Sequence, residues 1–286
     1  NRIMFPISDR NNKIIAFGGR VFDSNDPAKY INSSETPIYN KSKVFYGLSI
    51  TKGFLSKENT AIVVEGYLDL IQLFQNDIKN VVAVSGTSLT DSHALELNKY
   101  VKNVKIAYDG DNAGKNAAIR AGYVLLKNGF FPEIVVIPEN TDPDDWIQKE
   151  GPIPLKNAIE NSVNLFEFQY KNTDIDDSNP NSISNLVNDI LREISDVVDP
   201  VHKELCIRSI AKVTKLNENT LFESLNNMNS KKSFKKNYDE KREKTDNNDL
   251  SKYNLLEDEL VQICFSNDFK TRLFIYENME TEWMIS

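Results

Sequence analysis

The sequence contains very little cysteine or histidine, with two of each among 286 residues. Cys206 and Cys264 stand far apart and do not combine with the two histidines into the paired spacing of a zinc site. We therefore predict that this stretch binds no zinc. Two buried, reduced thiols in a cytoplasmic protein are the expected alternative.

Long hydrophobic runs are also absent. No stretch approaches the roughly 18 apolar residues that a transmembrane helix needs, so we predict no membrane association. The opening residues 1–6 resemble neither a signal peptide nor the start of a chain, and they lead directly into a strand pattern. We expect this sequence to be a fragment of a protein that continues upstream.

The chain lacks an excess of positive charge, since its net charge is −8, and this at first argues against a nucleic-acid partner. The distribution is uneven, however. Residues 1–60 contain nine Lys and Arg against five Asp and Glu, so the acidic excess lies in the remainder. A basic front segment beside acidic residues favours an enzyme that holds a polyanion and also binds cations.

Two apolar segments near the start, 3–7 and 13–22, are separated by the polar turn 9–12 and predict a β-hairpin. Gly18-Gly19 within the second segment indicates a bulge or the close approach of another backbone. The stretch from Asp23 to Lys43, with two prolines, is predicted to be rich in loop.

From residue 61 onward, short apolar runs alternate with helical patterns. The predicted strands are 61–64, 81–84, 104–108 and 134–137, and the predicted helices between them are 67–75, 91–100 and 112–127. This alternation predicts an α/β fold with a parallel sheet flanked by helices. Ligands of such folds bind beyond the carboxyl ends of the strands.

Residues 154–228 have no convincing strand pattern, and apolar residues recur at helical spacing in 163–170, 183–197, 201–213 and 217–225. The polar stretch that follows is typical of a linker, and a last helical pattern begins near Leu255. The predicted segments are 1–58, 59–150, 151–228, the linker 229–253, and 254–286.

Three acidic clusters follow predicted strands. They contain Glu65 and Asp69, then Asp109 and Asp111, then Asp142 and Asp144. Each motif alone is typical of an ordinary turn or helix cap. Together at strand ends, they would repel one another unless a divalent cation such as Mg²⁺ compensated the charge. Two such ions can stabilise both oxygens of a phosphoryl displacement.

Residues 61–146 resemble the Toprim domain of primases, topoisomerases and related nucleases, with Glu-Gly-Tyr at 65–67 and Asp-Gly-Asp at 109–111. The resemblance implies a Toprim-type sheet at 59–150. It also implies that Glu65, Asp109 and Asp111 are catalytic and hold Mg²⁺ or Mn²⁺, with Asp69, Asp142 and Asp144 as further metal ligands. Glu65 would then also transfer a proton.

The flanking residues resemble DnaG-type bacterial primases. The motifs are Met-Phe-Pro-Ile at 4–7, Ala-Phe-Gly-Gly-Arg at 16–20, Lys-Tyr-Ile-Asn at 29–32, Ser-Gly-Thr-Ser-Leu-Thr at 85–90 and Asp-Pro-Asp-Asp at 142–145. This resemblance implies a small basic β-rich subdomain at 1–58, a helical subdomain at 151–228 and the start of a helicase-binding domain at 254–286. It also implies binding of nucleotide and nucleic acid by Lys29, Lys41, Asn32, Arg20 and Arg2.

The function implied is primer synthesis in DNA replication, with NTPs, a single-stranded DNA template and the RNA primer–DNA hybrid as ligands, and a replicative helicase as partner. Two alternatives stay open from the residues alone. One is another Toprim enzyme, a nuclease or topoisomerase, although none of the eleven tyrosines is marked as a nucleophile. The other is a non-catalytic fragment that recruits a helicase and uses its carboxylates for a structural ion.

Overall fold

The computed structural model describes residues 1–22, 28–173 and 179–228. Residues Asn1–Leu225 form one compact unit. The predicted linker 229–253, the predicted terminal segment 254–286 and Cys264 lie outside the described residues. The division of the remainder at residues 58 and 150 stays a prediction.

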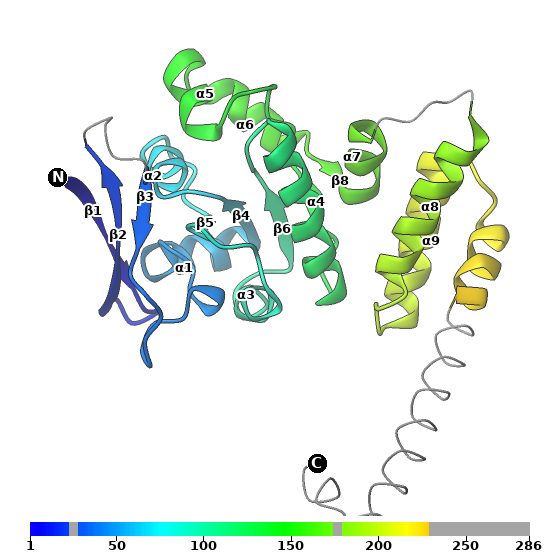
Figure 1. Ribbon diagram of the computed structural model, residues 1–286, viewed down its shortest axis with the longest axis horizontal. Coiled ribbons are helices and arrows are strands. Elements are labelled where there is room, and N and C mark those ends of the chain that lie inside the picture. Colours follow the sequence, from blue (N-terminus) through cyan, green and yellow to red (C-terminus); the bar gives the residue numbers. More distant parts are fainter. Residues whose placement is uncertain (23–27, 174–178, 229–286) are drawn as a thin grey trace, which may run out of the picture. The chain divides into compact units, whose positions relative to one another are not determined.

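The N-terminal sheet has three antiparallel strands in the order β1 (Arg2–Ser8), β2 (Ile14–Val21) and β3 (Tyr30–Asn32) (Figure 1). The predicted hairpin is confirmed, with Phe5 opposite Gly18 in the register. Within the stretch 23–43, which was predicted to be rich in loop, the three residues of β3 pair with β2. Strand β3 lies at the edge of the sheet and begins with Tyr30. Lys29, a predicted nucleotide-binding residue, directly precedes it.

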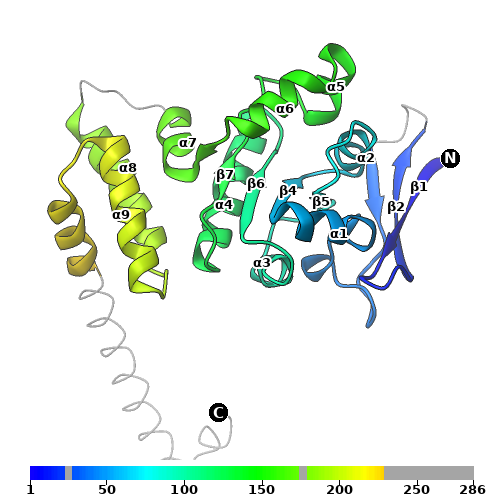
Figure 2. The ribbon, with the colours of Figure 1, turned by 180° about the vertical axis from the view of Figure 1, so that it is seen from behind.

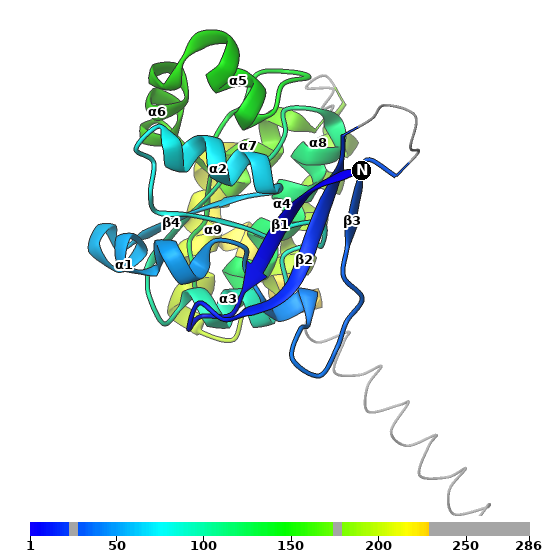
Figure 3. The ribbon, with the colours of Figure 1, turned by 90° about the vertical axis from the view of Figure 1, so that its left-hand side faces the viewer.

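Gly18 is the position of close approach that the sequence indicated. A Cβ atom there would lie 2.5 Å from the ring of Tyr67, the first residue of the helix that follows Glu65. The ring of Phe5 stacks on the same tyrosine, with centroids 4.8 Å apart. The N-terminal sheet, which faces the viewer in Figure 3, therefore packs against Tyr67 through a position where only glycine fits.

The second sheet has five strands in the order β5-β4-β6-β7-β8. Their bounds are β4 (Thr60–Val64), β5 (Val81–Ala83), β6 (Asn103–Ile106), β7 (Glu133–Ile134) and β8 (Val163–Asn164). The first four are parallel, as predicted, and their apolar residues are buried because helices cover both faces. Figure 2 shows β6 and β7 side by side from behind.

The expectation of no strand after residue 154 is wrong, since β8 pairs antiparallel with β7. Two residues carry too little alternation to be recognised from sequence. β7 is also shorter than the predicted strand 134–137, because only residues 133 and 134 pair with β6.

Helices connect and follow these strands. They are α1 (Leu48–Glu58), α2 (Tyr67–Gln75), α3 (Asp91–Leu97), α4 (Asn112–Lys127), α5 (Pro143–Glu150), α6 (Pro152–Glu160), α7 (Leu165–Asn172), α8 (Pro180–Ile194) and α9 (Pro200–Thr214), with a 3₁₀ turn η1 (Lys41–Lys43). Residues 218–228 are also helical. The predicted helices 67–75 and 112–127 are confirmed to the residue, whereas α1, α5 and α6 were not predicted.

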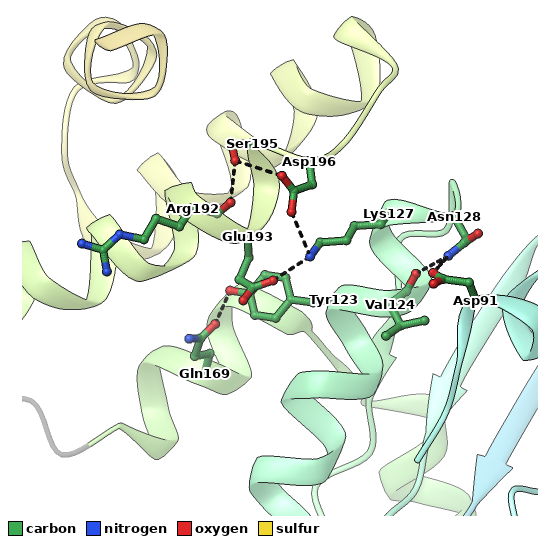
Figure 4. Close-up of polar contacts among 10 residues, drawn as sticks. All are labelled: Asp91, Tyr123, Val124, Lys127, Asn128, Gln169, Arg192, Glu193, Ser195 and Asp196. Atoms are coloured by element: carbon green, nitrogen blue, oxygen red, sulfur yellow. Dashed lines mark hydrogen bonds and ion pairs between the residues drawn. The ribbon is translucent and has the colours of Figure 1, made fainter. Parts of the chain in front are cut away.

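Side-chain contacts connect the C-terminal half of α4 to the helices beyond the sheet (Figure 4). The Lys127 ammonium lies 2.8 Å from a Glu193 carboxylate oxygen and 3.4 Å from one of Asp196. One turn earlier, the Tyr123 hydroxyl donates to the Gln169 side chain. Such partly exposed pairs contribute little each, but together they fix α4 at the end opposite its acidic N-terminus.

The described helices include none long and apolar enough to cross a membrane. Cys206 on α9 is a free, fully buried thiol, as predicted, and burial raises its pKa to about 12. A thiol that stays protonated is a poor nucleophile and metal ligand.

His93 is fully buried in the first turn of α3 and connects that helix to the preceding basic turn. Its Nδ1 accepts from the Thr90 amide at 3.3 Å, and its Nε2 lies 3.3 Å from the Val44 carbonyl oxygen. The ring also packs on Phe45, with centroids 4.5 Å apart. These partners require a neutral ring with its proton on Nε2. Burial lowers the pKa of His93 from about 6.5 to about 4.

We therefore expect His93 to make the fold sensitive to mild acid. Between pH 6.5 and 4 the unfolded chain holds a proton on His93 that the folded chain does not, so the free energy of unfolding falls as pH falls. The loss from this group is about 2 kcal/mol at pH 5. Urea unfolding at pH 7.5 and pH 5 should show a larger drop for the parent than for His93→Asn; equal drops would contradict this role.

Candidate metal centre

The acidic residues converge because their strands are neighbours. β4 and β6 are adjacent and parallel, with Val63 opposite Ile106, and Glu65 and Asp109 follow shortly after these ends. Asp142 precedes α5, which begins beyond β7. Since parallel strands end at the same edge of a sheet, the three clusters open onto one place.

A cleft of about 950 Å³ lies at this edge. Nine of the eleven predicted site residues line it: Glu65, Asp69, Asp109, Asp111, Asp142, Asp144, Arg20, Lys29 and Asn32. The structure thus brings the predicted acidic cluster and most of the predicted basic residues into a single cavity.

Helix caps orient two of the carboxylates. Asp111 is the N-cap of α4 and accepts from the Gly114 amide at 2.7 Å, while Asp142 is the N-cap of α5 and accepts from the Asp145 amide at 2.6 Å. In each case only Oδ1 is used, so within the described residues Oδ2 has no hydrogen-bond donor. Each cap therefore fixes the side chain and leaves one oxygen for a ligand.

Gly110 permits the tight approach of two site loops. A Cβ atom there would lie 1.9 Å from the Pro138 carbonyl oxygen, which no side chain could tolerate. The Gly110 amide also donates to the Thr141 carbonyl at 2.8 Å. The glycine between Asp109 and Asp111 thus brings the loop of Asp142 against them.

Asp69 differs from the other carboxylates because both of its oxygens already accept backbone hydrogen bonds. Oδ2 accepts from the Gly66 amide at 2.9 Å, and Oδ1 from the Asp144 amide at 3.3 Å. Its side chain is only 8% exposed. Asp69 therefore ties the turn of Glu65 to the first turn of α5, and its predicted role as a direct metal ligand stays a prediction.

Burial and mutual repulsion raise the pKa values of these carboxyl groups. The pKa values of Asp69 and Asp109 rise to about 7, and those of Glu65 and Asp142 rise as well. Loss of hydration is the largest cause for each, and neighbouring carboxylates add to it. Lys29 opposes the shift at Asp109 and Asp142, so its ammonium acts directly on the acidic cluster.

The basic wall of the cleft comes from the N-terminal sheet and consists of Arg20, Lys29, Tyr30 and Asn32. The Arg20 guanidinium lies over the Tyr30 ring, 5.8 Å from its centroid. Asn32 is anchored at both ends of its amide, since Nδ2 donates to the Ser85 carbonyl at 2.9 Å and Oδ1 accepts from the Tyr67 hydroxyl at 2.7 Å. Asn32 thus joins this wall to the Toprim-like sheet.

Two predicted binding residues do not line the cleft. Arg2 donates from Nη1 to the carbonyl of Ala28 at 2.9 Å and to that of Gly19 at 3.4 Å, so it supports the N-terminal sheet. Lys41 lies on η1, outside the residues that line the cleft.

Three features of the cleft were missed in the sequence, namely Tyr67, the loop 85–89 and Arg120. Tyr67 and the loop stand in motifs that carried the family resemblance but had no role assigned. Arg120 could have been found by helical spacing, because it lies on the same face of α4 as Ala113 and Ala117.

The residues of the cleft fit a hard divalent cation. All candidate donors are carboxylate oxygens, the set that Mg²⁺ and Mn²⁺ prefer, and the pKa values of Asp69 and Asp109 are raised first by burial and then by neighbouring carboxylates. In the ranges that the structure describes, no three Asp, Glu, His or Cys side chains are grouped closely enough for a preformed ligand set. Binding would therefore require small rotations of these side chains.

Comparison with protein families gives two matches. Residues 1–52 match the family model described as the DNA primase catalytic core, N-terminal domain. Residues 62–147 match the Toprim-like family model. The Toprim fold expected from the sequence is thereby confirmed.

The individual proteins that match this chain are DNA primases as well. A DNA primase of Clostridium acetobutylicum is 39% identical over 230 residues, covering 78% of this chain and 37% of its own length. The crystal structure of a DNA primase domain from Pseudomonas aeruginosa superposes with a TM-score of 0.70 at 31% identity, covering 79% of this chain and 72% of that one. A DnaG primase catalytic domain bound to single-stranded DNA gives a TM-score of 0.66 at 33% identity, covering 77% and 71%. The chain spans well under half the length of the curated relatives that it matches.

Thermal unfolding with and without Mg²⁺ separates the roles of two buried carboxylates. Asp109→Asn removes one charge with little change of shape. Asp69→Asn removes one charge and also replaces an oxygen that accepts a backbone amide with a donor, so it should lower the stability without Mg²⁺. We expect saturating Mg²⁺ to stabilise the parent chain by about 2–3 kcal/mol and the Asp69→Asn variant nearly as much, while Asp109→Asn loses most of the gain.

The stabilisation by Mg²⁺ should be larger at pH 8 than at pH 6, because protons compete for carboxyl groups whose pKa is about 7. Should Asp69→Asn be as stable as the parent without Mg²⁺ and yet lose the Mg²⁺ effect as completely as Asp109→Asn, Asp69 would have to be a direct ligand instead of a bridge between backbone amides.

Proposed function

The chain belongs to the family of DnaG-type DNA primases, and on that basis we propose that it forms the metal-dependent catalytic part of an enzyme that makes short RNA primers on single-stranded DNA. The observation that carries this proposal is the shared cleft: the acidic cluster and the basic wall line the same cavity. A centre for divalent cations beside a wall for phosphates is the arrangement that nucleotidyl transfer requires.

The proposed catalytic residues are Glu65, Asp109 and Asp111. When bound there, Mg²⁺ or Mn²⁺ would polarise the phosphate and lower the pKa of the attacking 3′-hydroxyl. The oxygens that would hold it are those of Asp109 and the Oδ2 atoms of Asp111 and Asp142, which the helix caps leave without a donor. The remaining candidate ligands are Glu65, Asp69 and Asp144, and one oxygen of Asp144 accepts from Gln148 at 2.6 Å.

Glu65 is proposed as the group that moves the proton. Its pKa is raised, with burial as the largest cause, so it is a stronger base than an exposed glutamate. One carboxylate oxygen accepts from the Asp109 amide at 3.4 Å, which leaves the other available. In the reaction, the 3′-oxygen forms a bond to the α-phosphorus of an NTP, pyrophosphate leaves, and Glu65 takes up the hydroxyl proton.

The basic wall would hold phosphate groups. Lys29 acts electrostatically on the acidic cluster and supplies a flexible point charge for a triphosphate. Arg20 and Asn32 line the same side, whereas Arg2 and Lys41 would contribute only along a path outside the cleft. A DnaG catalytic domain of similar fold binds single-stranded DNA, which supports a DNA template as ligand of this chain. Such backbone contacts weaken with salt.

Further partners follow from the same proposal. The RNA primer–DNA hybrid would occupy the cleft after synthesis begins, and a replicative helicase would bind through the region from residue 254, which lies outside the described residues. The alternatives of a Toprim nuclease or topoisomerase, and of a recruitment fragment, have no observation in their favour beyond the acidic residues that all Toprim enzymes share.

Primer synthesis by the complete gene product on a single-stranded template tests the proposal. Asp111→Asn keeps helix capping, because asparagine caps as well as aspartate, but removes a proposed ligand. Asp199→Asn is the matched control, since Asp199 caps α9 by the same hydrogen bond, at 2.8 Å to the His202 amide.

We expect Asp111→Asn to lower primer synthesis by about a hundredfold or more, since removal of a group that stabilises transition-state charge typically costs this much. Asp199→Asn should remain near the parent. Primer synthesis by Asp111→Asn at the parental rate would exclude Asp111 as a catalytic residue of primer synthesis. Relaxation of supercoiled DNA by the parent would favour the topoisomerase alternative.

A further inference from the structure

The carboxylates and the basic wall do not account for the whole lining of the cleft. One face of α4 and the loop 85–89 that follows β5 also line it. Ala113, Ala117 and Ala121 repeat every four residues along α4, so this wall is low and flat. Arg120 is the cation on this wall.

Arg120 has no partner that would account for its position. Within the described ranges its guanidinium forms no ion pair or hydrogen bond, although the cleft contains many carboxylates. Its charge nevertheless acts on Glu65, so it faces the acidic cluster from a distance. An arginine kept near carboxylates without pairing with them is free to bind an anion that enters between them.

The opposite wall presents unused donors. Ser85 and Gly86 both have positive φ, of 54° and 82°, which turns the chain sharply. In the described part of the chain, the amides of residues 86–89 donate to no protein acceptor, and the same holds for the hydroxyls of Thr87 and Ser88. Concave loops of successive free amides are typical anion-binding sites.

This loop is nevertheless held in place at both ends. The Ser85 amide donates to the Glu65 carbonyl at 2.9 Å, and the Ser85 carbonyl accepts from Asn32 at 2.9 Å. At the other end the Thr90 hydroxyl donates to the Ser42 carbonyl at 2.6 Å. The free amides therefore belong to a fixed loop, so binding of an anion would cost little ordering.

We propose that Arg120 and the loop 86–88 form a second phosphate-binding subsite in this cleft, in addition to Lys29. This inference rests on the proposed function, since it gives the cleft of the acidic cluster a further cation for a phosphate group. The ligand chemistry is a phosphate oxyanion, which the planar guanidinium can bind through two parallel hydrogen bonds. It could come from the triphosphate of an NTP or from the backbone of a DNA strand.

Equilibrium binding by the complete gene product, with Mg²⁺, would use two probes: ATP and an oligo-dT single strand. Arg120→Gln removes the charge, and Arg120→Lys keeps the charge without the planar fork. Ser88→Glu adds a negative charge to the exposed loop. Lys115→Gln is the matched control, because Lys115 lies on the same helix but pairs with Glu139 at 3.3 Å and lines a different, smaller cavity.

We expect Arg120→Gln and Ser88→Glu to raise Kd by about tenfold for at least one probe, the scale of a lost charge-assisted hydrogen bond. Arg120→Lys should recover part of the loss, and Lys115→Gln should bind like the parent. Weaker ATP binding alone identifies the triphosphate as the source. Weaker oligo-dT binding, with a salt dependence reduced by about one phosphate contact, identifies the strand backbone.

Parental binding of both probes by Arg120→Gln and Ser88→Glu would overturn the subsite. That failure is distinct from failure of the proposed function. The subsite would be wrong and the function intact if Asp111→Asn lost primer synthesis while Arg120→Gln bound normally. The anion site would stand without the polymerase assignment if Asp111→Asn kept synthesis while Arg120→Gln bound weakly.

Discussion

Carboxylates that face one another across the end of a parallel sheet repel, and in this chain the backbone holds them there. Adjacent strands β4 and β6 end side by side, which brings Glu65 next to Asp109. Helix N-caps then fix Asp111 and Asp142, and two backbone amides fix Asp69. Burial and this repulsion together raise the pKa values of the carboxyl groups, and both would be relieved by a bound cation.

The aromatic ring of Tyr67 places the basic wall opposite this acidic cluster. Tyr67 begins α2 directly after the turn of Glu65, stacks on Phe5 and fills the space that Gly18 leaves open. Its hydroxyl donates to Asn32, which in turn binds the Ser85 carbonyl. The buried Tyr67 side chain therefore sets the distance between the N-terminal sheet, which carries the basic residues, and the turn that carries Glu65.

Features determined by short stretches of sequence were predictable. The helices at 67–75 and 112–127 were predicted correctly because their apolar spacing and capping residues are local. The carboxylates that share the cleft could be grouped because parallel strands must end at one edge. The residues that the sequence could not place depend on contacts between distant segments. Strand β3 forms because it pairs with β2, and its three residues carry no strand pattern of their own. Asp69 accepts its second hydrogen bond from the Asp144 amide, which lies 75 residues further along the chain.

Arg120 and the amides of 86–88 illustrate the same limit, because a side chain without a partner leaves no pattern in the sequence. Helical spacing places Arg120 on one face of α4, but it does not show which other residues that face contacts. Only the fold shows that α4 is fixed at its far end by Lys127 (Figure 4). It also shows that the acidic end of α4 and Arg120 share one cleft.

The central claim is that crowded carboxylates create a centre for divalent cations, and calorimetric titration with Mn²⁺ at pH 7 in buffers of different ionisation enthalpy tests it most directly. Two carboxyl groups with pKa values of about 7 are each half protonated at that pH. If both lose their protons when the ion binds, the account predicts saturable binding with release of about one proton. Absence of saturable Mn²⁺ binding, or binding without proton release, would contradict it.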